Sequence, residues 1–320
     1  MQPTSTIVII IISMKVFVSE YTDPWMNLAI ETWLYKRKDM LNQEILFLYR
    51  NTESVIIGRF QNPWLECDLH QMSENNISFA RRQSGGGSVY HDLGNTNFTF
   101  ISDEDIFIKE EKTALVIRAL KTLGIDAEQG KRNDIYVDNK KISGSASKYS
   151  SSRVLHHGTL LINADLDALN KYLITKDYNR GLLKSKGIAS IRSDVANLQE
   201  FEKSLNHNKV CEAIIHEFSK GINEPIDITN LEIPNLNDIK EIKDYYSIIT
   251  DWDWLFGKTP SFTATAPVLL GNSKTDCLFK INKGIIIEIS CNRDISLIEN
   301  NYINQRCDKL MEMINRDINI

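Results

Sequence analysis

The residues able to do chemistry in this 320-residue chain gather in two short segments rich in small amino acids. The first is RRQSGGGSVYH, from Arg81 to His91, in which three consecutive glycines follow two arginines. Glycine loses more backbone entropy on folding than any other residue, so three together weaken an element unless the chain must approach a ligand closely. Main-chain N–H groups freed by glycines can converge on an anionic oxygen. The segment therefore indicates a site for a phosphate or a flat base, although a flexible turn with solvated arginines has the same composition.

Strand geometry limits which of these side chains can meet. Successive side chains on a strand point to opposite faces, so only one of Arg81 and Arg82 can face the same ligand. The same rule applies to His156 and His157 in the strand-like HHGTLL, where at most one imidazole can line a pocket. Such a histidine can orient an attacking amine or accept its proton, and it can equally be a core histidine bonded to a backbone carbonyl.

The second segment is KKISGSASK, in which Lys141 precedes the small residues at 143–146. A lysine is normally a solvated surface charge. Here the thin backbone beside it leaves room for a ligand under a long cationic arm, which favours Lys141 over Lys140 as a functional group. The two segments together predict a pocket.

Asn133 and Asp134 precede the second segment. Their oxygens suit a Mg²⁺ that keeps several waters and binds substrate phosphate. The pair Asn-Asp is also common in turns, so both interpretations stay open.

Apolar periodicity predicts the elements that position these segments. Asp23 as N-cap and Pro24 at the first position start a helix, and Gly124 ends another. A third helix is expected near 66–75 and a fourth at 165–173. Strands are expected at 45–50, 54–59, 77–82, 88–91, 95–101, 134–146 and 154–164. The strands 45–50 and 54–59 should be adjacent and antiparallel, and 134–146 should form a hairpin that turns at Asp138-Asn139. Antiparallel strands predominate with helices packed on them, which predicts a mixed α+β fold.

Composition changes along the chain predict its domains. Met14 opens the strand-like MKVFVSE, so residues 1–13 are interpreted as an N-terminal extension, with an unusual transit segment as the alternative. The apolar run in these residues is too short to cross a bilayer. A catalytic domain is expected at 14–222. The Pro- and Asn-rich stretch 223–245 is interpreted as a linker, and 246–320 as a small C-terminal accessory α+β domain.

Charge and cysteine content exclude some classes of protein. The net charge of −5 means that no overall positive field draws the chain to nucleic acid, so any anion site is local. Nothing indicates a membrane protein. The five cysteines include no CxxC pair, which argues against a disulfide framework and a zinc site and favours a reducing compartment.

On the basis of these residues and the segments around them, the chain resembles the lipoate-protein ligases. The resemblance lies in DPWMNLAIE, SVIIGRFQNPWLEC, ARRQSGGGSVYHDLGNTNFTF, RNDIYV, KKISGSASK and HHGTLLINADL, in this order, with a looser match at DWDWLFGKTPSF. It implies the catalytic fold shared by biotin and lipoate protein ligases, followed by the accessory domain.

The resemblance also implies a reaction in two steps. Lipoate and Mg²⁺·ATP give lipoyl-AMP and pyrophosphate, and a lysine amine of a lipoyl domain then displaces AMP. The implied acceptors are the acyltransferase subunits of 2-oxo-acid dehydrogenase complexes and the glycine-cleavage H protein. A monomer in the cytoplasm, or in the mitochondrial matrix of a eukaryote, is expected.

Site residues follow from the same resemblance. It implies ATP binding by Arg82, Gly87, Ser88, Val89, Tyr90 and Lys141. It implies lipoate binding by Tyr49, Ser84, Gly85, Gly86, His91, Lys141, Ser143, Gly144 and His157. Lys141 is the expected catalytic residue, and Asn133 with Asp134 lies where phosphate and metal gather. Tyr49 departs from the tryptophan of some relatives, so the lipoyl pocket can differ in width.

Other activities fit part of the pattern. A lipoyltransferase that uses preformed lipoyl adenylate or an acyl carrier, without its own ATP step, would share the same blocks. An octanoyl transferase acting through an acyl-cysteine needs a thiolate after the HG strand, and residues 156–181 contain no cysteine. Biotin ligation is disfavoured by the SGGG loop, and a non-catalytic binding module would not need Lys141.

Overall fold

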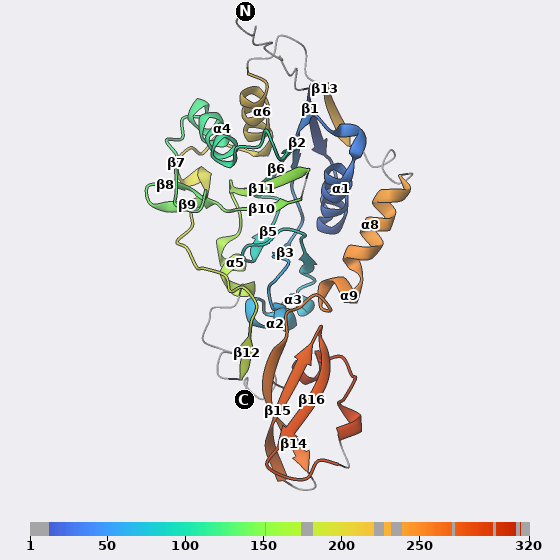
Figure 1. Ribbon diagram of the computed structural model, residues 1–320. Coiled ribbons are helices and arrows are strands. Elements are labelled where there is room, and N and C mark those ends of the chain that lie inside the picture. Colours follow the sequence, from blue (N-terminus) through green and yellow to red (C-terminus); the bar gives the residue numbers. More distant parts are fainter. Residues whose placement is uncertain are drawn as a thin grey trace, which may run out of the picture.

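A mixed six-stranded sheet forms the centre of the protein (Figure 1). The structure, a computed structural model, describes residues 13–150, 152–173, 182–220, 227–231, 239–270, 273–296, 299–311 and 314. The strand order is β10 (Ser145–Tyr149), β11 (Arg153–Leu161), β6 (Asn95–Asp103), β2 (Gln43–Tyr49), β1 (Ser13–Ser19) and β13 (Asp227–Leu231). The β2–β1 and β1–β13 pairs are parallel and the others are antiparallel. The predicted α+β class is confirmed.

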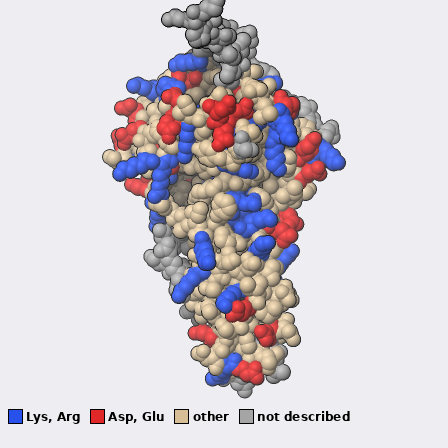
Figure 2. All heavy atoms as spheres, viewed as in Figure 1, with Lys and Arg blue, Asp and Glu red and all other residues tan. Residues whose placement is uncertain are grey.

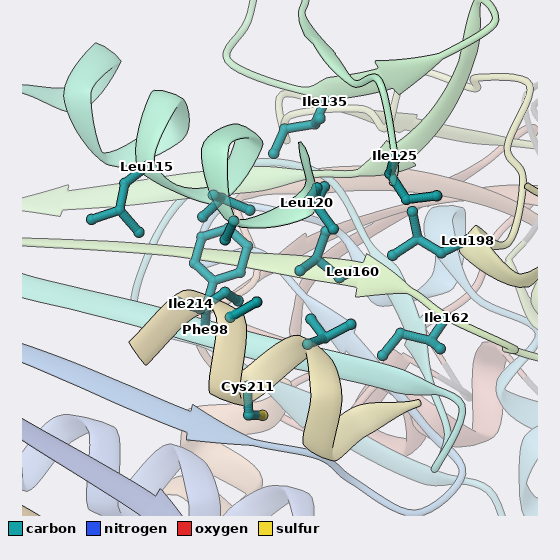
Figure 3. Close-up of a cluster of buried hydrophobic side chains, with 14 of the residues drawn as sticks. Phe98, Leu115, Leu120, Ile125, Ile135, Leu160, Ile162, Leu198, Cys211 and Ile214 are labelled. Carbon is teal, nitrogen blue, oxygen red and sulfur yellow. The ribbon is translucent and has the colours of Figure 1, made fainter. Parts of the chain in front are cut away.

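Helices cover both faces of this sheet. On one face lie α4 (Lys109–Thr122) and α6 (His207–Phe218), and on the other lie α1 (Pro24–Lys36) and α8 (Lys240–Thr250). Strand alternation divides β2 between them, because Leu46 packs with the first helix pair and Phe47 with the second. Figure 3 shows the first cluster, in which Phe98 and Leu160 of the sheet meet Leu120 and Ile214 of the helices.

The helix and hairpin signals of the sequence are confirmed. The carboxylate of Asp23 accepts hydrogen bonds from the backbone N–H groups of Trp25 (2.8 Å) and Met26 (3.2 Å) at the start of α1. Gly124 follows α4 with a positive φ of 82°. The hairpin of β8 (Ile135–Val137) and β9 (Lys140–Ser143) turns through Asp138-Asn139, both with positive φ as a type I′ turn requires.

The predicted pairing of strands 45–50 and 54–59 is wrong. β3 (Ser54–Ile57) leaves the central sheet and lies in a second sheet, between β4 (Ser78–Arg81) and β5 (Val89–His91). The connection cannot close a hairpin because its groups bond elsewhere. The Thr52 N–H donates to the Thr22 carbonyl (2.8 Å), and the Asn51 amide bonds to Asn27 and His91.

The helix expected near 66–75 is divided in two. α2 (Pro63–Glu66) ends at Cys67, and Asp68 caps α3 (Leu69–Glu74) by accepting from the Gln71 N–H at 3.0 Å. The fourth predicted helix is α5 (Leu166–Tyr172). The shorter elements are η1 (Lys38–Met40), β7 (Glu128–Gln129), η2 (Leu198–Glu200), α9 (Trp252–Leu255) and η3 (Glu299–Asn301).

A four-stranded antiparallel sheet forms the opposite end of the molecule from α4 and α6 (Figure 1). Its order is β12 (Leu183–Ser185), β14 (Phe262–Leu270), β15 (Ser273–Asn282) and β16 (Ile285–Cys291). β12 comes from the range assigned to the catalytic domain, and β13 comes from the presumed linker but pairs with β1. The division into 14–222, 223–245 and 246–320 stays a prediction. Residues 1–12 of the presumed extension lie outside the described residues.

One disulfide corrects the argument from cysteine spacing. Cys277 and Cys291 are joined, because the register of β15 and β16 places them opposite each other with their Cα atoms 4.5 Å apart. Cys67, Cys211 and Cys307 are free and buried. Across the described ranges, no helix is long and apolar enough to cross a membrane, and no three His, Cys, Asp or Glu side chains are grouped to hold a metal ion.

Truncation of a leucine in the sheet core tests this packing. Leu160 is fully buried, so Leu160→Ala should lower the free energy of unfolding by about 2–5 kcal/mol through lost burial and a residual cavity. Leu93 is 48% exposed, and Leu93→Ala should cost less than about 0.5 kcal/mol. Urea denaturation measures both. Similar losses in the two variants would contradict the assignment of this core.

Candidate functional site

Two adjoining cavities lie between the glycine loop and strands β9 and β11. The larger has a volume of about 420 Å³ and the smaller about 280 Å³. They share lining residues from four places in the sequence: Ser88, Val89, Lys141, Gly144, Thr159, Ser190 and Ile191. The predicted pocket is therefore a pair of connected cavities with Lys141 at the junction.

Glycines allow the loop to pack tightly at the end of β3. A Cβ at Gly58 would lie 2.2 Å from the Gly86 carbonyl oxygen, and Gly86 itself has a φ of +86°, which side chains rarely adopt. The Arg59 N–H donates to the Ser84 carbonyl (2.8 Å), which ties the loop to the turn after β3. Close backbone contact thus explains two of the glycines.

Arg82 organises the loop from inside. Its guanidinium is buried and donates to the carbonyl oxygens of Ile56 (3.1 Å), Gly85 (2.7 Å) and Gly87 (2.6 Å), and to the Ser84 hydroxyl (3.1 Å). Burial lowers its pKa to about 10, and the charge of Glu31 partly opposes this shift. The arginine stays charged at neutral pH and borders the smaller cavity.

Arg81 points the other way, as strand alternation predicts. It donates to the carbonyl oxygens of Leu255 (2.8 Å) and Gln61 (2.9 Å) and to the Thr259 hydroxyl (3.1 Å). Burial and the nearby charge of Arg59 lower its pKa to about 9. Arg81 therefore joins the turn after β3 to the segment around α9. The alternative of two solvated arginines is wrong, since both are buried.

A buried chain of polar groups runs from α1 to the glycine loop. His157 Nδ1 lies 2.8 Å from Glu31 Oε1, and His157 Nε2 lies 2.7 Å from Ser84 Oγ. Burial raises the pKa of Glu31, but His157, the Thr99 hydroxyl and Arg82 outweigh it, so the net pKa is lowered. An ionised Glu31 accepts a hydrogen bond from the His157 Nδ1–H, which leaves Nε2 free to accept a hydrogen bond from the Ser84 hydroxyl. The arrangement can pass a proton between Ser84 and His157.

The neighbouring His156 faces the opposite side of β11, where its ring contacts Phe98 and Phe107. Only His157 borders the smaller cavity, as predicted. Glu31 was not singled out from the sequence. The only signal was an acidic residue at a position of α1 that the apolar pattern assigns to the buried face.

His91 is a buried neutral donor. Its Nδ1 lies 2.9 Å from Asn51 Nδ2, an amide nitrogen that can only donate, so the ring proton must be on Nε2. Burial, Arg82 and His157 lower its pKa to about 3. Nε2 is buried and has no partner within the described part of the chain, while His91 lines the smaller cavity. It is therefore placed to donate a hydrogen bond to a bound ligand.

Lys141 is held by backbone bonds and one ion pair. Its N–H donates to the Asp194 carbonyl (2.8 Å), and its Nζ lies 3.0 Å from the carboxylate of Asp134. A Cβ at Gly144 would lie 3.3 Å from the Lys141 Cε, so glycine leaves room for the lysine to lie along the cavity wall. Lys141 borders both cavities.

The two predicted metal residues separate. Asp134 lines the smaller cavity beside Lys141. Asn133 lines neither cavity, and its side-chain oxygen accepts a hydrogen bond from Gln129. The positive φ of Asn133, 60°, fits the turn interpretation of this residue. A metal role for the pair stays a prediction.

The structure brings most of the predicted site residues together. The smaller cavity is lined by Tyr49, Arg82, Gly86 and His91, and also by His157. The larger cavity is lined by Tyr90 and Ser143. Both cavities are lined by Ser88, Val89, Lys141 and Gly144, and Gly87 lines the smaller one. Ser84 and Gly85 instead line a groove on the outer side of the loop. Their ligand contacts stay predictions.

The segment 188–193 was not singled out from the sequence. Ser190 accepts hydrogen bonds from the Ser88 N–H (3.0 Å) and the Gln61 amide (2.9 Å), so it lines both cavities beside the start of β5. Ile191 borders both cavities, and Arg192 borders the larger. Nothing in its local pattern distinguishes this segment from a loop.

The chain is similar to known proteins over most of its length. Residues 23–219 match the family described as Lipoyl protein ligase A/B catalytic domain. The chain is 45% identical to the lipoate-protein ligase A of Psychrobacter cryohalolentis over 257 residues, covering 78% of this chain and 74% of that protein. It is 38% identical to the lipoate-protein ligase A of Bdellovibrio bacteriovorus over 285 residues, covering 88% and 83%.

Solved structures give the same similarity. The crystal structure of P. falciparum LipL1 in complex with lipoate superposes with a TM-score of 0.67 at 32% identity, covering 92% of this chain and 90% of that one. A lipoate-protein ligase A bound with ATP gives 0.60 at 27% identity, covering 74% and 93%. The bipartite lipoate protein ligase of Thermoplasma acidophilum, described with its E2 lipoyl domain, gives 0.61 at 26%, covering 76% and 96%.

The buried neutral His91 predicts acid sensitivity. Its folded pKa of about 3 lies below the ordinary 6.5, so the unfolded chain takes up the proton first as the pH falls. The stability due to neutral His91 is complete above about pH 6.5 and is lost towards pH 3. Between pH 7 and 5 the loss should be on the order of 1–2 kcal/mol. His91→Asn should remove that share of the decrease, measured by urea denaturation at both pH values. The exposed His216→Asn should keep the wild-type decrease, and an unchanged decrease in His91→Asn would contradict the prediction.

Proposed function

The chain belongs to the lipoate-protein ligases of the lipoyl protein ligase A/B family, and we propose that it activates lipoate with ATP and transfers the lipoyl group to a lysine of a lipoyl domain. The observation that supports this most directly is the position of Lys141, whose side chain borders both cavities. An acyl adenylate has its reactive centre between an acyl chain and a nucleotide. A cation at the junction of two cavities is suited to that centre.

The cavities differ in a way that suits two ligands. The smaller has apolar wall residues, Leu28, Ile56 and Val89, together with polar groups that include Lys141 and His91, a lining that suits a fatty-acid-like chain with one carboxyl. The larger has the greater volume, about 420 Å³, and the apolar Leu161 and Leu169 beside the polar Asn170. We assign lipoate to the smaller and the adenosine part of ATP to the larger. One relative is described in complex with lipoate and another bound with ATP, which supports the choice of these two ligands.

In the first step the lipoate carboxylate attacks the α-phosphorus, a C–O–P linkage forms and pyrophosphate leaves. Negative charge accumulates on the phosphate oxygens as this happens. The Lys141 ammonium and the His91 Nε2–H are two groups at the cavities that can stabilise it. The backbone around Gly86 and Gly87 can approach the phosphate closely because no side chain intervenes.

Magnesium fits this site in a limited way. Asp134 is the carboxylate beside Lys141, and the residues described here supply no group of three metal-binding side chains. Such a site suits an ion that is bound mainly by nucleotide phosphates and water, with Asp134 as a protein ligand. When bound, Mg²⁺ would neutralise phosphate charge. Asn133 stays a predicted ligand, and its side-chain oxygen accepts a hydrogen bond from Gln129.

In the second step a lysine amine of the acceptor attacks the acyl carbonyl. The C–N bond forms, the C–O bond to phosphate breaks, AMP leaves, and the amine loses a proton. Lys141 stabilises the oxyanion on the carbonyl carbon. Ser84 and His157 can take up the amine proton, since Glu31 holds Nδ1 and leaves Nε2 as the acceptor. No covalent bond to the enzyme is needed.

The acceptors we propose are lipoyl domains of 2-oxo-acid dehydrogenase complexes and the glycine-cleavage H protein. The Thermoplasma relative is described with an E2 lipoyl domain, which supports the first class. A lipoyltransferase that uses preformed lipoyl adenylate is the second candidate, because it would use the same cavities. Lipoate-dependent exchange of pyrophosphate into ATP separates the two, since only the ligase performs it.

Replacement of Lys141 tests the proposed chemistry. Loss of a charge that stabilises the transition state typically costs about 3–4 kcal/mol, so Lys141→Ala should reduce lipoate-dependent ATP–pyrophosphate exchange by about 10²–10³-fold. The matched control is Lys140→Ala, whose ammonium lies 3.4 Å from the exposed Glu200 and lines neither cavity, so this variant should keep wild-type exchange. Circular dichroism checks that both variants are folded. Wild-type exchange by Lys141→Ala would exclude the role of this lysine.

A further inference from the structure

A third hollow lies on the outer side of the glycine loop, with a volume of about 540 Å³. Three cationic residues line it: Lys36 of α1, Arg59 after β3, and Lys148 of β10. We call it the cationic groove. It is separate from the two cavities of the proposed active site, and its only predicted site residues are Ser84 and Gly85.

The three cations of the groove rest on aromatic rings. Lys36 lies 4.5 Å from the ring centre of Tyr245, Arg59 lies 4.3 Å from that of Trp254, and Lys148 lies 4.9 Å from that of Tyr35. None of the three has an ion-pair partner among the residues that the structure describes. Glu241 and Asp244 lie near Tyr245 on α8 but do not line the groove. The charges are therefore held in position with no acidic side chain among the lining residues of the groove.

Mutual repulsion accompanies this arrangement. Burial lowers the pKa of Lys148, and the charges of Lys36 and Arg59 lower it further, against a smaller opposing effect of Glu31. The whole chain has a net charge of −5, so a concentration of positive charge here is opposite in sign to the rest of the molecule. Figure 2 shows Lys and Arg side chains gathered at mid-height on the visible face of the molecule. An anionic partner would relieve the repulsion.

The rim of the groove is apolar and exposed. Phe60 is 54% exposed, Tyr149 57% and Ile248 53%. Small anions are bound by enclosed N–H and guanidinium donors, whereas a protein surface buries an apolar patch together with charged pairs. Positive charge between exposed aromatic and aliphatic side chains fits an acidic protein face better than a free phosphate.

A thin wall formed by the glycine loop separates the groove from the smaller cavity. Ser84 and Gly85 line the groove, and the next two residues of the loop line the smaller cavity. On β10, Ala146 faces the cavity and Lys148 the groove. Ser84 Oγ is bonded to His157 Nε2 on the cavity side (2.7 Å), and a Cβ at Gly85 would meet no atom within 4 Å. A side chain that entered over Gly85 would therefore meet the Ser84–His157 pair.

We infer that the cationic groove is the docking surface for an acidic face of the acceptor domain, and that the acceptor lysine enters over Gly85. The inference rests on the proposed function, because it takes the acceptor to be a lipoyl domain. Charge complementarity orients the domain, and the exposed rim contributes apolar burial. The attacking amine then arrives beside the groups suited to accept its proton.

Charge reversal in the groove tests this directly. The probe is an unmodified lipoyl domain with a net negative charge, and its binding is measured by isothermal titration calorimetry at low salt. Lys36→Glu and Lys148→Glu should each weaken binding by about tenfold, with a smaller effect at high salt. Lys203→Glu, an exposed change of the same charge outside the groove, should bind as the wild type does.

The transfer reaction provides a second measurement. In Lys36→Glu, KM for the lipoyl domain should rise by about tenfold while KM for ATP and lipoate-dependent pyrophosphate exchange stay unchanged. Reversing an acidic residue next to the acceptor lysine of the domain should restore part of the binding to Lys148→Glu, as a charge swap requires.

Each outcome decides the inference. Unchanged binding in both groove variants, or a rise in KM for ATP in place of that for the domain, would overturn it, the latter indicating a phosphate site. No binding of the domain to the wild type would overturn it as well. Loss of wild-type pyrophosphate exchange with normal, charge-dependent binding would instead refute the ATP-dependent function and leave the docking surface supported.

Discussion

The buried guanidinium of Arg82 is the interaction on which the arrangement of the site depends. A loop of three glycines has little reason to hold one conformation, because glycine has no side chain to pack and much backbone entropy to lose. Arg82 supplies donors to the carbonyl oxygens of Gly85 and Gly87 and to the Ser84 hydroxyl, and it is anchored to Ile56 at the end of β3. One rigid, planar cation thus holds a flexible segment in a defined shape. This loop lies within the segment that matches the family, and its residues line both cavities.

The glycine loop separates two regions with different electrostatics. On the cavity side Lys141 is paired with Asp134, and the carboxylate of Glu31 is hydrogen-bonded to His157. His91 is neutral there, and its Nε2–H has no acceptor within the described ranges. On the outer side Lys36, Arg59 and Lys148 have no ion-pair partner among the described residues. Paired charges keep an empty cavity stable until a ligand replaces one partner, whereas unpaired cations at an open surface attract an anionic surface over a distance.

Arg81 extends the same principle to the C-terminal part of the chain. Its guanidinium joins the turn after β3 to the carbonyl of Leu255 and the hydroxyl of Thr259, and Trp254 donates back to the Arg81 carbonyl at 2.7 Å. Trp254 also supports Arg59 in the cationic groove. The segment around α9 is therefore part of the framework of the loop, although the sequence places it far from the glycines. Arg81 ends β4 and Arg82 follows it directly, so the two adjacent side chains point to opposite sides of that framework, as in an extended chain.

Helix ends, turns and the facing of side chains on a strand depend on local chemistry, so they could be predicted from the amino-acid sequence. The start of α1 at Asp23-Pro24, the end of α4 at Gly124 and the turn at Asp138-Asn139 require only neighbouring residues, and the opposite facing of His156 and His157 requires only strand geometry. Only the tertiary structure decided which strands pair, because β3 leaves β2 for reasons that lie in Thr22, Asn27 and His91. The roles of Glu31 and Ser190, the separation of Asn133 from Asp134, and the pairing of Cys277 with Cys291 likewise depend on partners distant in the sequence. The local sequence pattern indicates which backbone conformation a residue favours, whereas packing between distant segments determines which groups its side chain contacts.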